Sequence, residues 1–177
     1  MSEKYNSEVL NVIHSRKSVR HFTGDIVKKT ELRLLVRAAM SAPSSKNNQP
    51  WEFILTNDRL ILDKLGDGLP YAKMLYKAGG AIIVCAVPEK ATEKKIEYAI
   101  IDVSAACENI LLAAEAIGLG AVWTAVYPQD DRMKFTSETL NIPANVIPFA
   151  VIPVGYPSGV DLPKDKFNPK VIHTDKW

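Results

Sequence analysis

Apolar residues follow a helical period in some segments of this chain and run continuously or alternate in others. Apolar positions 32, 35, 36, 39 and 40 share one face of a helix expected over residues 30–40, capped by Thr30 and ended before Pro43. Residues 81–87 form a continuous apolar run, which is typical of an interior strand covered on both faces. The same signals predict helices over residues 7–15, 59–65, 71–77 and 130–135, and strands over residues 51–55, 121–126 and 147–154.

Proline and cap residues refine two of these elements. Ser7 is the expected N-cap of the first helix, because its hydroxyl can accept a hydrogen bond from a free backbone N–H. Pro148 and Pro153 lack the N–H that a sheet needs, so we expect the last strand to lie at an edge or to carry its prolines near its ends.

Residues 97–117 predict the longest helix, which is apolar around most of its circumference. Its few polar positions are Asp102, Ser104, Glu108, Asn109 and Glu115. A chain of 177 residues has little material to cover such a helix completely, so we expect part of it in a subunit interface. The alternative is a central helix packed on a sheet within one subunit.

The length of the chain predicts a single domain over residues 1–177, with residues 158–177 as an irregular C-terminal arm. The arm carries Val171, Ile172 and Trp177, and large apolar side chains on an irregular segment usually dock on another surface. We expect that surface to belong to a partner subunit.

Composition limits the classes of function. The 22 basic and 20 acidic residues give a net charge of +2, too small to predict binding to nucleic acid or to a membrane surface. The first residues, MSEKYNSEV, lack the apolar core of a signal peptide, and no apolar run is long enough to span a membrane. Cys85 and Cys107 stand in apolar segments without metal-like spacing and are expected to be buried free thiols. We therefore expect a soluble, cytoplasmic protein.

Two polar segments carry the candidate chemistry. Residues 16–20, RKSVR, place Arg16, Ser18 and Arg20 on one side of an extended segment, where guanidinium groups can bind a phosphate. A solvated basic turn explains this cluster equally well. Residues 43–51, PSSKNNQPW, place uncharged donors and acceptors between two prolines beside Trp51, which suits the edge of a heteroaromatic ligand or an ordinary turn.

Taken together, these segments resemble the nitroreductase family of FMN-dependent oxidoreductases. SRKSVR at residues 15–20 is similar to the phosphate-end motif of that family, S-R-[RH]-S-x-[RK], and PSSKNNQPW is similar to its P-S-x-x-N-x-Q-P-W loop. IDVSAACENILLAAEAIGLGAVW at residues 101–123 resembles its central helix and the strand that follows, and IPFAVIPVGYP at residues 147–157 resembles its last core strand. The four segments occur in the family's order and extend the resemblance over nearly the whole chain.

The resemblance implies an α+β fold with a mixed sheet flanked by helices, assembled as an intertwined homodimer with exchanged C-terminal arms. It implies that four residues near the N-terminus of the chain contact FMN: Arg16, Lys17, Ser18 and Arg20. It implies contacts from the other subunit by Pro43, Ser44, Ser45, Asn47 and Gln49. It further implies that Lys73 reaches the flavin ring, that Thr124 and Ala125 lie beside flavin N5, and that Lys164 and Lys166 reach the phosphate.

The implied activity is transfer of a hydride from NADH or NADPH through flavin N5 to nitroaromatic, quinone or similar acceptors, in a ping-pong cycle. The flavin carries this chemistry, so we expect no catalytic side chain and no metal. The family often has glycine where this chain has Ala125, and the insertions that form a helical lid in longer members are missing, which implies an open substrate site. Two alternatives stay open: a dehalogenase or flavin-destroying enzyme of the same superfamily, and an FMN carrier or redox sensor without turnover.

Overall fold

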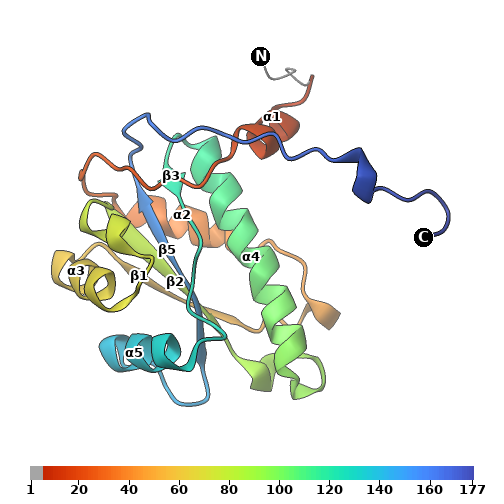
Figure 1. The fold of residues 1–177 in the computed structure, drawn as a ribbon. Coiled ribbons are helices and arrows are strands. Elements are labelled where there is room, and N and C mark those ends of the chain that lie inside the picture. Colours follow the sequence, from red (N-terminus) through yellow and green to blue (C-terminus); the bar gives the residue numbers. More distant parts are fainter. Residues whose placement is uncertain (1–5) are drawn as a thin grey trace.

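A five-stranded sheet lies at the centre of the computed structural model, which describes residues 6–177 (Figure 1). The helices are α1 (Glu8–Ser15), α2 (Lys29–Ala39), α3 (Arg59–Gly68), α4 (Ile96–Ala116) and α5 (Asp130–Leu140). The strands are β1 (Trp51–Thr56), β2 (Gly80–Ala86), β3 (Gly120–Ala121), β4 (Thr124–Ala125) and β5 (Ile147–Gly155). The elements form an α+β fold, as the sequence predicted.

The sheet has the order β1-β2-β5-β3, and β4 also pairs with β5. Every paired strand among residues 6–177 is antiparallel, and the parallel component of the expected mixed sheet is reduced to a single bridge between Ser18 and Ala121. Of the two alternatives for the last strand, the edge position was wrong, because β5 lies between β2 and the β3 and β4 strands. The other alternative was right, because Pro148 and Pro153 lie near the two ends of the strand. Pro148 is tolerated there because the register shifts beside it, between Val84 and Cys85 of β2.

Strand β2 divides the hydrophobic core into two layers by the alternation of its side chains. Ile82 and Val84 pack with residues of α2 and α4, whereas Ile83 and Cys85 pack with residues of α3 on the opposite face. Every residue of β2 is buried, which confirms the interior strand predicted from the apolar run.

Several element boundaries differ from the predictions for local reasons. Helix α2 begins at Lys29, and Thr30 lies inside it rather than capping it, because the Glu31 carboxylate accepts a hydrogen bond from the Lys28 N–H at 2.8 Å. The strand predicted over residues 121–126 is interrupted and forms β3 and β4. The helix predicted over residues 71–77 is only the short 3₁₀ turn η2 (Lys73–Tyr76), and α3 continues through Gly66 to Gly68.

Helix α4 and the C-terminal arm leave apolar side chains uncovered. On α4, Ile101 is 65% exposed although most of the helix packs against α2 and the sheet. The arm runs past α1 and then away from the body of the molecule (Figure 1). Phe167, Ile172 and Trp177 of the arm are all exposed. None of the helices formed by residues 6–177 combines the length and the hydropathy that crossing a bilayer requires.

Candidate cofactor site

The segment that carries the predicted phosphate-binding residues lies directly against β3. The Val19 N–H donates to the Ala121 carbonyl at 3.0 Å, and Ser18 forms the parallel bridge to the same residue. Gly120 permits this close approach, because a Cβ at that position would lie 2.6 Å from Cγ1 of Val19. The backbone of residues 18–20 is therefore fixed before any ligand binds.

The basic side chains of this segment differ in their partners. Arg16 Nε lies 3.3 Å from a carboxylate oxygen of Glu108, and Lys17 Nζ lies 3.0 Å from both carboxylate oxygens of Glu115. Both acidic residues belong to α4, far along the chain from their partners: Glu115 follows Lys17 by 98 residues. Arg20 forms no salt bridge with any residue among 6–177; its guanidinium makes a 3.5 Å contact to the Ser18 carbonyl. Arg20 therefore keeps its positive charge available.

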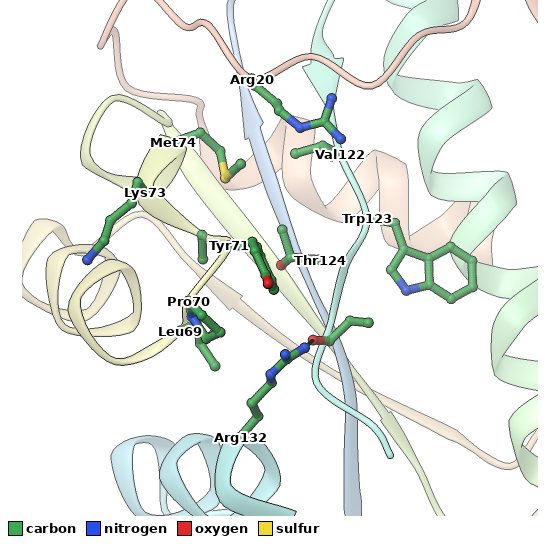
Figure 2. A pocket seen from close by; sticks show the side chains of 12 residues that line it. Arg20, Leu69, Pro70, Tyr71, Lys73, Met74, Val122, Trp123, Thr124 and Arg132 are labelled. Atoms are coloured by element: carbon green, nitrogen blue, oxygen red, sulfur yellow. Dashed lines mark hydrogen bonds between the residues drawn. The ribbon is translucent and has the colours of Figure 1, made fainter. Parts of the chain in front are cut away.

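Arg20 lines a cavity of about 490 Å³, within the size range of small-molecule sites. The wall opposite η2 is the segment that contains β4, and the cavity ends at α5. Figure 2 shows Arg20 and Arg132 toward opposite ends, with Tyr71 and Thr124 between them. The complete lining is Arg20, Leu69, Pro70, Tyr71, Ala72, Lys73, Met74, Val122, Trp123, Thr124, Ala125 and Arg132.

The structure brings four of the predicted site residues to this cavity: Arg20, Lys73, Thr124 and Ala125. The Lys73 ammonium points away, because Nζ donates to the Gly66 carbonyl at 2.9 Å and lies over the Tyr76 ring at 5.5 Å from its centroid (Figure 2). The Thr124 hydroxyl donates to the Val151 carbonyl within the sheet. Thr124 and Ala125 can therefore meet a ligand through their backbone more readily than through their side chains.

The predicted polar loop does not line this cavity. It forms the 3₁₀ turn η1 (Ser45–Asn47), which lies across α4 from α5 in Figure 1. The side chains of the loop hold each other: Ser44 Oγ accepts from the Gln49 N–H at 3.0 Å, and Asn47 Oδ1 accepts from Gln49 Nε2 at 3.1 Å. Pro43, at the start of the loop, is likewise absent from the cavity wall. One copy of the chain does not bring the loop and Arg20 together.

Lys164 and Lys166 are exposed on the C-terminal arm and also lie outside the cavity. The root of the arm is nevertheless tied to the Arg20 segment. One carboxylate oxygen of Asp161 accepts from the N–H groups of Arg20 and His21 at 3.0 and 3.1 Å. Burial raises the pKa of Asp161, but these hydrogen bonds and the His21 ring, whose Nδ1 lies 3.1 Å from the carboxylate, outweigh that effect, and the net shift of the pKa is downward.

The other eight of the twelve lining residues were not among the predicted site residues. Tyr71 and Met74 lie in the same short segment as Lys73. Their closeness in sequence to that predicted site residue was the signal that could have identified them. Arg132 follows two aspartates at the start of α5, a pattern typical of a solvated helix end, and gave no signal. Trp123 contributes to the wall, and its ring packs on Phe149 with centroids 5.4 Å apart.

The other candidate chemistries find no support among the residues that the structure describes. Cys85 and Cys107 are buried free thiols, as predicted, and burial raises the pKa of both, that of Cys85 to about 12. A thiol that stays protonated is a poor nucleophile. Over residues 6–177, no group of three or more His, Cys, Asp or Glu side chains is placed to hold a metal ion.

The α+β fold thus holds a cavity between η2 and the segment that contains β4, with Arg20, Lys73 and Arg132 as its charged lining residues. The family model described as "Nitroreductase family" matches residues 13–68 and 63–156. This chain belongs to the nitroreductase family, as its motifs predicted.

Individual relatives cover almost the whole chain. A protein of Archaeoglobus fulgidus named "Putative NADH dehydrogenase/NAD(P)H nitroreductase" is 41% identical over 173 residues, which are 96% of this chain and 99% of the relative. The crystal structure of a protein of the same name from Parabacteroides distasonis is 45% identical, with a TM-score of 0.91, over 97% of this chain and 100% of that one. An "FMN-dependent Nitroreductase" from Clostridium difficile is 27% identical, with a TM-score of 0.86, over 95% of this chain and 99% of that one.

Proposed function

We propose that this chain is an FMN-dependent oxidoreductase that uses NADH or NADPH to reduce small acceptors such as nitroaromatics or quinones by a ping-pong cycle. The observation that carries the proposal is the cavity with Arg20 at one end and the backbone of residues 122–125 along one wall. The names of the relatives, which include an FMN-dependent nitroreductase, support the choice of cofactor and electron donor.

The residues present fit FMN. The cavity has the volume of a small-molecule site, its wall beside β4 is uncharged, and the Arg20 guanidinium has no carboxylate partner among residues 6–177. Bound FMN would supply the redox chemistry, because its ring accepts a hydride and passes electrons to an acceptor. Arg20 would supply a fixed cation that favours negative charge on the bound ligand. Arg16 and Lys17 would contribute less charge, because Glu108 and Glu115 already neutralise them.

The complete site requires two copies of the chain in this proposal. The polar loop at η1 lies apart from the cavity of its own chain, and the arm that carries Lys164 and Lys166 leaves the body of the molecule. An apolar groove between α1 and α4, lined by residues that include Val9, Ile13 and Leu112, gives the second copy a surface to bury. A homodimer would therefore bring the loop of one copy to the cavity of the other.

The experiment is to purify the protein, record its absorption spectrum and measure FMN per chain. We expect a yellow protein whose flavin is bleached by NADH or NADPH without oxygen and regains colour when a nitroaromatic acceptor is added. A flavin that binds but is not bleached faster with nicotinamide would indicate a carrier or sensor instead. A protein that takes up no FMN would refute the proposal.

A variant tests the role of the guanidinium. We expect Arg20→Ala to weaken FMN binding by about ten-fold or more, the usual scale for losing a hydrogen bond to a charged group. Arg33→Ala is the matched control, because Arg33 is exposed on α2 and lies outside the cavity. Equal FMN affinity in the two variants would remove Arg20 from the site.

A further inference from the structure

Arg132 lies at the end of the cavity opposite Arg20 and is held there by two contacts (Figure 2). Its Nη1 donates to the Ala125 carbonyl at 3.2 Å, and its Cζ lies 5.5 Å from the centroid of the Tyr71 ring. A hydrogen bond and a cation–π contact together fix the plane of the guanidinium. Arg132 is thus placed before any ligand arrives.

The charge of Arg132 is not neutralised by residues 6–177. Asp130 and Asp131 precede it in α5, but neither comes within ion-pair distance, and no other carboxylate does so. No acidic residue lines the cavity, whereas Arg20, Lys73 and Arg132 all do. Beyond the bond to Ala125, the remaining donors of the guanidinium fork form no hydrogen bond within the described residues.

The end of the cavity at Arg132 is open to solvent, because Tyr71 is 74% exposed. Helix α5 carries none of the residues proposed to hold FMN, and the Arg20 end of the cavity lies next to the segment that carries several of them. An exposed end with a free cation suits a substrate that enters and leaves better than a cofactor that stays.

We propose that Arg132 is a selectivity residue that binds an anionic group of the electron donor or of the acceptor. This inference rests on the proposed function and names the substrate class for the same cavity. A guanidinium fork pairs with a carboxylate or a phosphate through two parallel hydrogen bonds, which a neutral substrate does not offer. The anion is either the 2′-phosphate that distinguishes NADPH from NADH, or a carboxylate on the acceptor.

The test compares substrates that differ by one anionic group. The donor comparison measures NADPH against NADH with nitrobenzene as acceptor. The acceptor comparison measures 4-nitrobenzoate against nitrobenzene with NADH as donor. In one of the two comparisons, we expect Arg132→Ala to lower kcat/KM by about ten-fold or more for the substrate that carries the additional anionic group, and to change kcat/KM by less than about three-fold for the substrate that lacks this group. Arg132→Lys is expected to fall between, because lysine keeps the charge and loses the fork.

Lys134→Ala is the matched control, because Lys134 is exposed on the same helix and its nearest carboxylate, Glu138, is 4.0 Å away. We expect it to leave both ratios unchanged. A binding measurement accompanies the kinetics: adenosine 2′-phosphate or 4-nitrobenzoate is titrated into the oxidised holoenzyme and followed by flavin absorbance. We expect Arg132→Ala to raise the Kd of one of these two probes by about ten-fold or more, the one that carries the anionic group bound by Arg132.

The outcomes separate the possibilities. A selective loss of kcat/KM in the donor comparison assigns the anion to NADPH, and a selective loss in the acceptor comparison assigns it to the acceptor. Either result supports the proposal. Unchanged ratios and unchanged Kd values overturn it while leaving the reductase function standing. Equal losses for all four substrates together with loss of FMN also overturn it, because Arg132 would then hold the cofactor. A wild-type protein without FMN or NAD(P)H oxidation overturns both proposals.

Discussion

Asp102 on α4 accepts a hydrogen bond from the backbone N–H of Ser45 at 3.0 Å and thereby fixes the polar loop to the longest helix. The second oxygen of Asp102 is buried and has no hydrogen bond among residues 6–177. Asp102 shares the support of the loop with Thr92, whose hydroxyl donates to Ser45 Oγ at 2.8 Å and accepts from Asn48 Nδ2 at 3.1 Å.

The loop needs such support because its backbone is strained. Lys46, Asn47 and Gln49 all have φ between 50° and 58°, a region that non-glycine residues adopt at a cost. We expect Asp102→Ala to lower the free energy of unfolding by about 1–3 kcal/mol, the usual cost of leaving a buried donor unpaired. Urea unfolding measures this change. Ser104→Ala on the same helix is the control, with an expected change within about 0.5 kcal/mol, because its hydroxyl bonds only to the Ile100 carbonyl of its own helix.

Asp161 gives a second prediction, since it joins the root of the arm to the segment that carries Arg20. We expect Asp161→Ala to increase hydrogen exchange at the Arg20 and His21 amides, which lose their acceptor. Asp165→Ala, which removes an acceptor for the Phe167 N–H further along the arm, should leave both amides protected.

The lowered pKa of Asp161 gives this contact a pH dependence. The native state prefers the ionised carboxylate, so the contact stabilises the fold fully above the unfolded pKa of about 3.9 and is lost as the pH falls through the lower folded value. Wild-type and Asp161→Ala proteins should therefore converge in stability in acid. A difference that persists at the lowest pH would contradict this origin.

Periodicity predicted the elements whose environment is uniform along their length. The continuous apolar run of β2 and the apolar circumference of α4 each follow from burial alone, and both elements were located within a residue or two. The resemblance to the family implied that Thr124 and Ala125 lie beside flavin N5; both residues line the cavity, and their contact with N5 stays a prediction.

Features that depend on distant contacts were not predictable in the same way. The interior position of β5 depends on a register shift that leaves Phe149 of β5 without a paired residue in β2, which the prolines alone do not reveal. The direction of the Lys73 ammonium depends on one rotamer and the Gly66 carbonyl. Arg132 reaches the cavity only because α5 packs against α3 and β5, and its own neighbours in sequence are acidic.

The ion pair between Lys17 and Glu115 predicts a measurable coupling. Their side chains are only 23% and 16% exposed, so removing either one leaves the other charge poorly solvated. We expect a double-mutant cycle with Lys17→Ala and Glu115→Ala, followed by urea unfolding, to give a coupling of about 1–2 kcal/mol. The exposed pair of Lys134 and Glu138, 4.0 Å apart, should give less than about 0.5 kcal/mol in the same cycle. Equal couplings would show that burial adds nothing to the Lys17 pair.

The two buried thiols make a prediction about alkaline pH. Burial raises the pKa of Cys107 and raises that of Cys85 to about 12, whereas in the unfolded chain both ionise near the ordinary value of about 8.5. Above that pH the unfolded state gains stability by ionising and the folded state does not, so the free energy of unfolding falls as the pH rises, by up to about 1.4 kcal/mol per pH unit for each thiol. Urea unfolding from about pH 8 to pH 10 measures how steeply the free energy of unfolding falls with pH. The Cys85→Ala, Cys107→Ala variant should show a smaller slope, and the difference isolates the contribution of the thiols.

Ellman's reagent tests whether the two thiols are inaccessible in the folded protein. At about pH 8 it should label neither thiol in the folded protein and both in urea. Rapid labelling of the folded protein would show that these cysteines are accessible.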